Sequence, residues 1–244
     1  MNEGAEIPDY ESMLERFYRG LLSRGDTCVD IGAHIGRHTY PMLECVGAGG
    51  RILAFEPIPD LAQALRMQVE SRGLSKTISI HQLALADEAG AAAFYIAVDA
   101  PGYSGLRRRV YDVPTSVREI EVQLRTLDDM VDGVIDSLNY IKIDAEGAEW
   151  SILRGARKAL ERFRPVVSFE FGEASYGVFG VDPEEVHQFF LELDYLVYDL
   201  RGRLLDRHAF AASSRHQELW DYIAIPRERD QVSTLAPLIM RVVA

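Results

Sequence analysis

The chain alternates between short apolar runs and longer stretches in which apolar residues recur every three or four positions. The short runs predict buried strands, and the longer stretches predict amphipathic helices. This alternation predicts an α/β fold with a doubly wound, mostly parallel, seven-stranded Rossmann-like sheet and a late antiparallel strand at one edge. Strands are expected over 27–32, 51–56, 77–83, 137–144, 165–171, 195–200 and 219–225, and helices over 8–24, 39–46, 60–73, 149–160 and from 182 onward.

Turn and capping residues mark the ends of several predicted helices. Gly25 and Gly73 are expected to end the first and third helices, and Asp60 to cap the third. Asp182, with proline at the next position, is expected to open the last predicted helix. We expect an N-terminal helical cap over residues 1–26 and one domain over residues 27–244.

Residues 90–125 interrupt the strand–helix rhythm. Residues 92–98 and 118–124 predict a pair of exposed strands, whereas residues 101–114 between them contain prolines and glycines and show no clear period. Unstructured loops of that length in a compact domain are usually functional or mobile. An inserted hairpin and loop is therefore expected to act as a lid over a bound molecule.

The charge balance bears on the partners of the chain. Its 244 residues include 38 acidic and 26 basic side chains, a formal net charge of -12. Such a balance argues against sequence-independent nucleic-acid binding and against docking on an anionic membrane. No apolar run approaches the ~20 residues of a membrane span. Residues 1–6 lack the features of a signal peptide, and Cys28 and Cys45 are predicted core thiols, so we expect a cytoplasmic protein.

Acidic side chains follow most of the predicted parallel strands. Asp30, Glu56, Asp87, Asp144 and Glu170 each stand at or just after the end of a strand. Ligands of doubly wound sheets bind beyond the carboxyl ends of the strands, so these side chains are expected to share one site. Any one of them could be a solvated surface carboxylate, but the set as a whole favours a binding site.

A glycine-rich turn connects the first strand to the next helix. It reads Asp-x-Gly-x-x-x-Gly, from Asp30 to Gly36, and lacks the Gly-x-Gly-x-x-Gly spacing of nicotinamide and flavin binders. Glycines 32 and 36 are expected to let the backbone approach a bulky ligand. The carboxylate of Glu56 suits the two hydroxyls of a ribose. Together these features predict a cofactor that contains adenosine.

Six segments of the chain resemble the FkbM family of class I S-adenosylmethionine-dependent methyltransferases. The segment from Lys142 to Glu149, Lys-Ile-Asp-x-Glu-Gly-x-Glu, is the most specific of them. The family usually has asparagine at the position of His34, so this histidine either bonds the cofactor or faces the methyl acceptor. The resemblance covers about residues 25–172 and rests on residues 29–39, 55–57, 84–87, 125–129, 141–149 and 164–170.

The resemblance implies S-adenosyl-L-methionine as the cofactor and S-adenosyl-L-homocysteine as the product. The glycine turn would line the methionine portion, Glu56 would accept the ribose hydroxyls, and Asp87 would lie near the adenine. Asp30 would order the turn or meet the cofactor's ammonium group. The expected cofactor-binding residues are Asp30, Gly32, Ala33, His34, Gly36, Thr39, Glu56, Pro57, Ala86 and Asp87.

Methyl transfer to a hydroxyl requires alignment of oxygen and methyl group and a base for the proton. The expected catalytic residues are Asp144 first, then Glu146 and Glu170. Asp144 and Glu170 could instead hold Mg²⁺, but this alternative is not favoured, because Glu170 can pair with a base such as Lys142 or Arg154. The weaker candidates are His34, His38 and His81.

The resemblance also implies an acceptor of small or medium size, such as a natural product, a polyketide or a glycoside. Arg107, Arg108 and Arg109 form either a solvated surface run or a contact for an anionic or carrier-bound acceptor. The N-terminal aromatics Tyr10, Phe17 and Tyr18 either roof the cofactor or pack in the core. A non-catalytic cofactor-binding module and a nicotinamide-dependent oxidoreductase are the alternative functions, and a homo-oligomer is compatible with the sequence.

Overall fold

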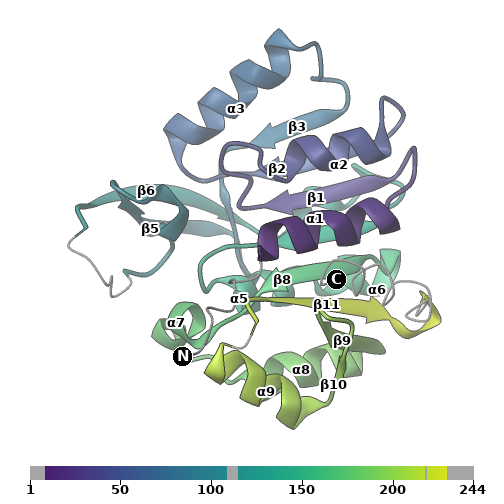
Figure 1. Ribbon diagram of the computed structural model, residues 1–244. Helices are drawn as coiled ribbons and strands as arrows, with labels where there is room; N and C mark the ends of the chain where they lie inside the picture. Colours follow the sequence, from purple (N-terminus) through teal and green to yellow (C-terminus); the bar gives the residue numbers. More distant parts are fainter. Residues whose placement is uncertain (1–8, 109–114, 218, 230–244) are drawn as a thin grey trace, which may run out of the picture.

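The computed structural model describes residues 9–108, 115–217 and 219–229. Its main sheet follows the order β10-β9-β11-β8-β7-β1-β2-β3, and the strands from β8 to β3 are parallel (Figure 1). The bounds are Thr27–Ile31 (β1), Arg51–Phe55 (β2), Ile78–His81 (β3), Tyr140–Ile143 (β7), Val166–Glu170 (β8), Tyr195–Asp199 (β9), Leu204–Leu205 (β10) and Asp221–Pro226 (β11). The predicted α/β fold with a mostly parallel sheet is confirmed.

Two details of the predicted sheet are wrong. Within the described residues the main sheet has eight strands rather than seven, because β10 adds a two-residue edge strand to β9. The late strand β11 is antiparallel to both of its neighbours and lies between β8 and β9 rather than at an edge. Every residue of β11 after Asp221 is buried, as its continuous apolar run requires.

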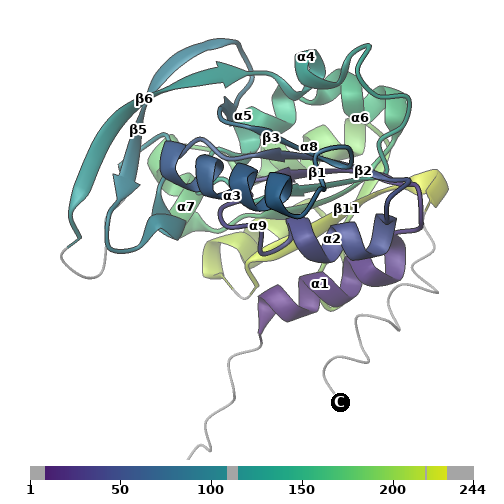
Figure 2. The same cartoon turned by 90° about the horizontal axis from the view of Figure 1, so that it is seen from above.

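Helices cover both faces of the sheet. In Figure 2, α1, α2 and α3 lie on one side, and α4, α5, α6 and α8 on the other. The bounds are Tyr10–Leu21 (α1), Thr39–Val46 (α2), Pro59–Ser71 (α3), Leu127–Val131 (α4), Glu149–Arg154 (α5), Arg157–Phe163 (α6), Glu173–Tyr176 (α7), Pro183–Glu192 (α8) and Arg207–His216 (α9). No helix in these described ranges is both long and apolar enough to cross a membrane.

Alternate residues of the strands supply the two halves of the core. On β1, Val29 and Ile31 pack toward the α5, α6 and α8 side, whereas Cys28 packs toward α1 and α2. Helix α1 buries Phe17 and Tyr18 in that second cluster. The structure therefore assigns these two aromatics to core packing rather than to a roof over a ligand.

Three predicted helix features can now be compared with the structure. Asp182 caps α8 by accepting a bond from the Glu184 amide, as expected. Asp60 is not a cap, because α3 begins at Pro59 with Ile58 at the cap position. The helix expected over 149–160 is two helices, α5 and α6, separated at Gly155.

Gly155 breaks that helix because it packs directly against the chain that follows β4 (Ala84–Leu85). A Cβ on Gly155 would lie 2.0 Å from the carbonyl oxygen of Ala86. Its own carbonyl accepts a hydrogen bond of 3.0 Å from the Asp128 amide. The tight contact therefore holds α4, α5 and the residues after β4 together.

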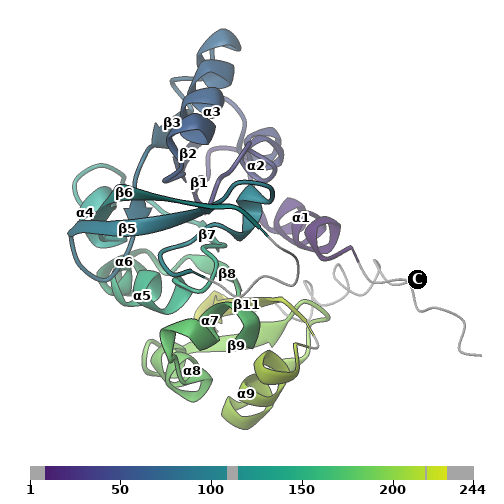
Figure 3. The ribbon, with the colours of Figure 1, turned by 90° about the vertical axis from the view of Figure 1, so that its left-hand side faces the viewer.

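The segment between β4 and α4 forms a second, three-stranded sheet of order β4-β6-β5. Strands β5 (Gly90–Ala97) and β6 (Val117–Arg125) pair antiparallel along their length and project to the left of the main sheet in Figure 1. Figure 3 views the molecule from that side, with β5 and β6 in front. Residues 101–106 fold back on β5, where Tyr95 bridges Gly105 and the Ser104 hydroxyl accepts a bond from the Ala97 amide. Of the three consecutive arginines 107–109, Arg109 lies outside the described residues.

Candidate functional site

A row of carboxylates crosses one edge of the main sheet. The last paired residues of β1, β2, β7 and β8 are in register. The next positions on these strands are therefore Gly32, Glu56, Asp144 and Glu170, side by side. Strand β11 adds Asp221, which pairs directly with Glu170. Because adjacent strands lie about 4.8 Å apart, the predicted site residues on these strands converge.

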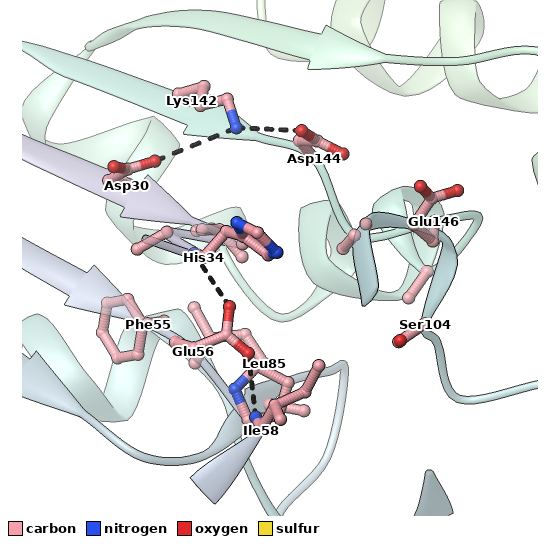
Figure 4. A pocket seen from close by; sticks show the side chains of 18 of the residues that line it. Asp30, His34, Phe55, Glu56, Ile58, Leu85, Ser104, Lys142, Asp144 and Glu146 are labelled. Atoms are coloured by element: carbon pink, nitrogen blue, oxygen red, sulfur yellow. Dashed lines mark hydrogen bonds and ion pairs between the residues drawn. The ribbon is translucent and has the colours of Figure 1, made fainter. Parts of the chain in front are cut away.

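A cavity of about 340 Å³ opens beyond this edge. Residues at the strand ends line it, and Ser104 of the fold-back segment 101–106 faces it beside Glu146 (Figure 4). Glu11 of α1 also belongs to the lining. Eight of the predicted site residues line this cavity: Asp30, Gly32, Ala33, His34, Glu56, Pro57, Asp144 and Glu146.

Glu56 is held in place by two backbone amides. Its Oε2 accepts a bond of 2.9 Å from the His34 amide, and its Oε1 accepts one of 2.8 Å from the Ile58 amide. The side chain is 4% exposed. Burial raises the pKa of Glu56 to about 7, although the two amide bonds oppose the shift. Each oxygen keeps acceptor capacity for a further donor, as recognition of a diol requires.

The two glycines of the turn are required by packing within the protein. A Cβ on Gly32 would lie 1.9 Å from the carbonyl oxygen of Asp144, and a Cβ on Gly36 would lie 2.7 Å from the ring of Tyr40. Both glycines also have a left-handed backbone, with φ of 77° and 90°. Gly36 does not line the cavity; its amide donates to the Ala33 carbonyl at 2.7 Å. The sequence predicts that these glycines make room for a ligand. The contacts show instead that they make room for other residues of the protein.

His34 lies between Glu56 and Asp144 in the cavity (Figure 4). Its backbone is left-handed, with φ of 49°, which directs its amide toward Glu56. Burial lowers the pKa of its imidazole despite the opposing charge of Asp144. Its Nε2 is buried and has no hydrogen-bond partner among the described residues. A neutral, partly unsatisfied imidazole therefore stands at the centre of the site.

Lys142 bridges two carboxylates of neighbouring strands. Its Nζ lies 3.0 Å from Asp144 Oδ2 and 4.0 Å from Asp30 Oδ1 (Figure 4). Burial alone would lower the pKa of Lys142, but the carboxylates of Asp144 and Asp30 outweigh it and raise that pKa. Asp30 also accepts a bond of 2.6 Å from the Thr39 hydroxyl. Thr39 thus acts on the site through Asp30 and does not line the cavity itself.

The loop after Asp144 is ordered by Glu149. Its Oε1 accepts bonds from the amides of Ala145 and Gly147, at 2.8 and 3.1 Å. Burial raises the pKa of Glu149 to about 7. The loop it closes puts Glu146 in a left-handed conformation, with φ of 54°, on the cavity wall beside Ser104 (Figure 4).

Glu170 lies behind Asp144 and outside the cavity lining. Burial, followed by the charges of Asp144 and Asp221, raises the pKa of Glu170 well above its ordinary value. The raised pKa favours the protonated form of Glu170 beside the carboxylate of Asp144. Glu170 does not pair with Lys142 or Arg154, as the simpler sequence interpretation supposed, because Lys142 pairs with Asp144 and Arg154 with Asp87.

Two of the residues expected near an adenine do not line the cavity. The carboxylate of Asp87 bonds Arg154 and accepts a bond of 2.6 Å from the Ser151 hydroxyl. The Ala86 amide donates to the Arg125 carbonyl at 2.9 Å. The apolar cavity wall at this position is formed instead by Ile58, Leu83, Leu85 and Phe94.

Sequence reasoning missed Lys142 and Glu11 as cavity residues and left His38 among the weaker candidates. Lys142 stands two positions before Asp144, so it shares a face of β7 with that carboxylate, and this spacing was a usable signal. Glu11 comes from α1 and has no local signal, because only the packing of α1 brings it to the cavity. His81 instead stacks on Phe55 with ring centroids 4.9 Å apart.

The carboxylates of the cavity are not arranged as a metal site. Among the described residues, no three His, Cys, Asp or Glu side chains converge as metal ligands would. The ammonium of Lys142 lies against Asp144, the residue that a Mg²⁺ ion would need most. The residues present therefore do not fit a magnesium site.

The cavity has an apolar half and a charged half, with Glu56 between them. Ile58, Leu85 and Phe94 line the first half, and Asp30, Lys142 and Glu11 line the second. An adenosine with a zwitterionic tail has the same order of groups: an apolar base, a diol and a charged end. The residues present thus fit S-adenosylmethionine.

Comparison with known proteins identifies the family. Residues 30–197 match the methyltransferase FkbM domain. "Methyltransferase 1" of Beauveria bassiana (strain ARSEF 2860) is 28% identical over an alignment of 143 residues, and the match covers 52% of this chain and 57% of that protein.

Solved structures share the fold. The FkbM methyltransferase of Methylobacillus flagellatus KT superposes with a TM-score of 0.54 at 21% identity, over 90% of this chain and 48% of that one. The O-methyltransferase TomG of Streptomyces achromogenes gives 0.50 at 11% identity, over 90% and 81%. The chain thus spans about half the length of the Beauveria and Methylobacillus proteins. On the domain match, this chain belongs to the FkbM family of S-adenosylmethionine-dependent methyltransferases.

Proposed function

We propose that this protein transfers the methyl group of S-adenosyl-L-methionine to a hydroxyl oxygen of a small or medium-sized acceptor. The observation that carries the proposal is the placement of Glu56. Its carboxylate faces the cavity between an apolar and a charged half, and two amides fix its orientation. Membership of the FkbM family supports the same reaction.

Different residues of the cavity bind the different parts of the cofactor. Glu56 accepts the two ribose hydroxyls, and Ile58, Leu85 and Phe94 contact the adenine. Asp30 and Lys142 lie at the end that receives the amino-acid tail. When bound, S-adenosylmethionine supplies an activated methyl group on its sulfonium.

Asp144 is the proposed base for the acceptor. Its carboxylate lines the cavity, Lys142 pairs with it, and Glu170 follows the neighbouring strand β8 at the same level. A hydroxyl directed at the methyl group can give its proton to a carboxylate oxygen of Asp144. Glu146, near Ser104 on the facing wall, is the proposed anchor for another polar group of the acceptor. Glu170 acts through Asp144 as a positioning residue.

The proposal also covers the chemical class of the acceptor. The preference for oxygen rests on the family resemblance, and a structure of the same fold is described as an O-methyltransferase involved in tomaymycin synthesis. A natural product, polyketide or glycoside as acceptor is likewise what the family resemblance implies. An anionic acceptor is less supported, because Arg107 packs over the ring of Phe179 with its guanidinium carbon 5.3 Å from the centroid. The family match does not favour a binding module or an oxidoreductase.

The test is a methyl-transfer assay with labelled S-adenosylmethionine and a panel of hydroxylated acceptors. Asp144→Asn should lower turnover about 100-fold or more while the cofactor affinity stays close to the original value. Asp87→Asn is the matched control, since Asp87 lies outside the cavity lining, and should change neither quantity. Equal turnover of Asp144→Asn and the original protein would contradict the assigned base. A chelator should leave turnover unchanged, because the residues do not fit a metal.

A further inference from the structure

The charged end of the cavity is closed by the N-terminal helix α1. Glu11 of this helix lines the cavity together with Arg37 and His38. Residues 10–21 lie outside the segment that matches the family domain, which begins at residue 30. The family match therefore assigns no role to Glu11.

A chain of hydrogen bonds holds Glu11 against the cavity. His38 Nε2 lies 2.6 Å from Glu11 Oε2, and His38 Nδ1 lies 3.1 Å from the Tyr18 hydroxyl. A carboxylate oxygen can only accept, so His38 donates the hydrogen bond from Nε2 to Glu11. The Tyr18 hydroxyl is bonded to Nδ1 on the other side of the same ring. Because Tyr18 and His38 are both buried, this chain fixes the carboxylate from the core outward.

Glu11 is charged, and one of its two carboxylate oxygens is available to a ligand. Its bond with His38, together with the charges of Lys142 and Arg37, lowers the pKa of Glu11. Among the described residues its Oε1 has no hydrogen-bond partner, since only Oε2 is bonded. Glu11, Asp30 and Asp144 put three carboxylates at this end against the ammonium of Lys142 and the guanidinium of Arg37. Arg37 is already paired with Glu15 at 2.5 Å.

We propose that Glu11 binds the α-ammonium group of the methionine tail of the cofactor, and that His38 and Tyr18 position it for this contact. The assignment rests on the proposed function and deepens it. A ligand seated with its ribose on Glu56 and its base in the apolar half extends its tail toward Glu11. The excess of carboxylates at that end favours a cationic group, and Arg37 offers the tail carboxylate a partner.

The experiment compares two ligands that differ only in the tail. S-adenosylhomocysteine and 5′-methylthioadenosine share adenine, ribose and a thioether, but only the first carries the amino-acid group. Calorimetric titration should show that Glu11→Gln weakens binding of S-adenosylhomocysteine about tenfold. Binding of 5′-methylthioadenosine should not change. Tyr18→Phe should produce a smaller loss of the same kind, because it removes only the far end of the hydrogen-bond chain.

Glu44→Gln is the matched control. Glu44 also touches α1, through a bond of 2.7 Å to Arg19, but it lies outside the cavity lining. It should leave both affinities unchanged. If Glu11→Gln changes neither affinity, or weakens both ligands equally, the assignment of Glu11 is overturned. If the original protein binds neither ligand, the proposed function fails as well, so the two failures are distinguishable.

Discussion

The ammonium of Lys142 lies 3.0 Å from the carboxylate of Asp144, and Lys142 is only 4% exposed. This pair sits at the end of β7, where the proposed base meets the cavity. Asp30 shares the same ammonium from the neighbouring strand, at 4.0 Å. One buried cation therefore serves two carboxylates of the site.

Removing that cation should destabilise the protein strongly. Lys142→Met leaves the carboxylates of Asp144 and Asp30 without their shared cation. Breaking a buried pair in this way costs about 3–5 kcal/mol. Urea denaturation measures the loss. Arg162→Met is the comparison, because Arg162 pairs with Asp132 at 3.1 Å on the exposed surface. That change should cost less than about 1 kcal/mol, and a similar cost for both variants would show that the Lys142 pairing is not important.

Cofactor affinity should depend on pH through Glu56. The pKa of this carboxyl is raised to about 7, so it is largely protonated at pH 6 and largely ionised at pH 8. The ionised form is the better acceptor for two ribose hydroxyls. Affinity for S-adenosylhomocysteine should therefore rise between pH 6 and pH 8. Glu56→Gln should weaken binding about tenfold at pH 8 and flatten this pH dependence; calorimetry at both pH values decides.

The stability of the fold should depend on pH through Glu149. Burial raises its pKa from 4.5 to about 7 in the folded protein. Its contribution to stability is therefore full below pH 4.5 and is lost as the pH rises through 7. Glu149→Gln keeps an oxygen for the amides of Ala145 and Gly147 but cannot ionise. The melting temperature of Glu149→Gln minus that of the original protein should be larger at pH 8 than at pH 5. The same difference at both pH values would contradict the assignment.

Gly32 should tolerate no side chain. Gly32→Ala would bring a Cβ within 1.9 Å of the Asp144 carbonyl and place alanine at a φ of 77°. We expect a loss of about 2–4 kcal/mol in the free energy of unfolding. Gly49→Ala is the control, because no atom lies within 4 Å of its Cβ position and its φ is not positive. The control should stay within about 0.5 kcal/mol.

The strands and the centre of the site could be predicted because both depend on local pattern. Continuous apolar runs located the parallel strands, since both faces of the sheet are covered by helices. Glu56 and Asp144 could be identified because each is the residue that follows such a run. The register of the strands then brings them to one edge.

The errors have a common physical origin in contacts between distant segments. Asp87 was expected near the adenine, but Arg154 of α5 takes its carboxylate. Gly155 ends α5 because of a backbone contact with Ala86. Glu11 reaches the cavity only because α1 packs on the sheet. None of these arrangements leaves a periodic signal in the local sequence.

The cavity draws its walls from two separately hydrogen-bonded sheets, β4-β6-β5 and the larger eight-stranded one. Residues 101–106, which follow β5, can therefore change without disturbing the register that aligns Glu56 with Asp144. A change confined to this segment alters the wall that carries Ser104 and leaves Phe94 and the other proposed adenine contacts in place. Chimaeras that swap only this segment are thus a natural starting point for redirecting the enzyme.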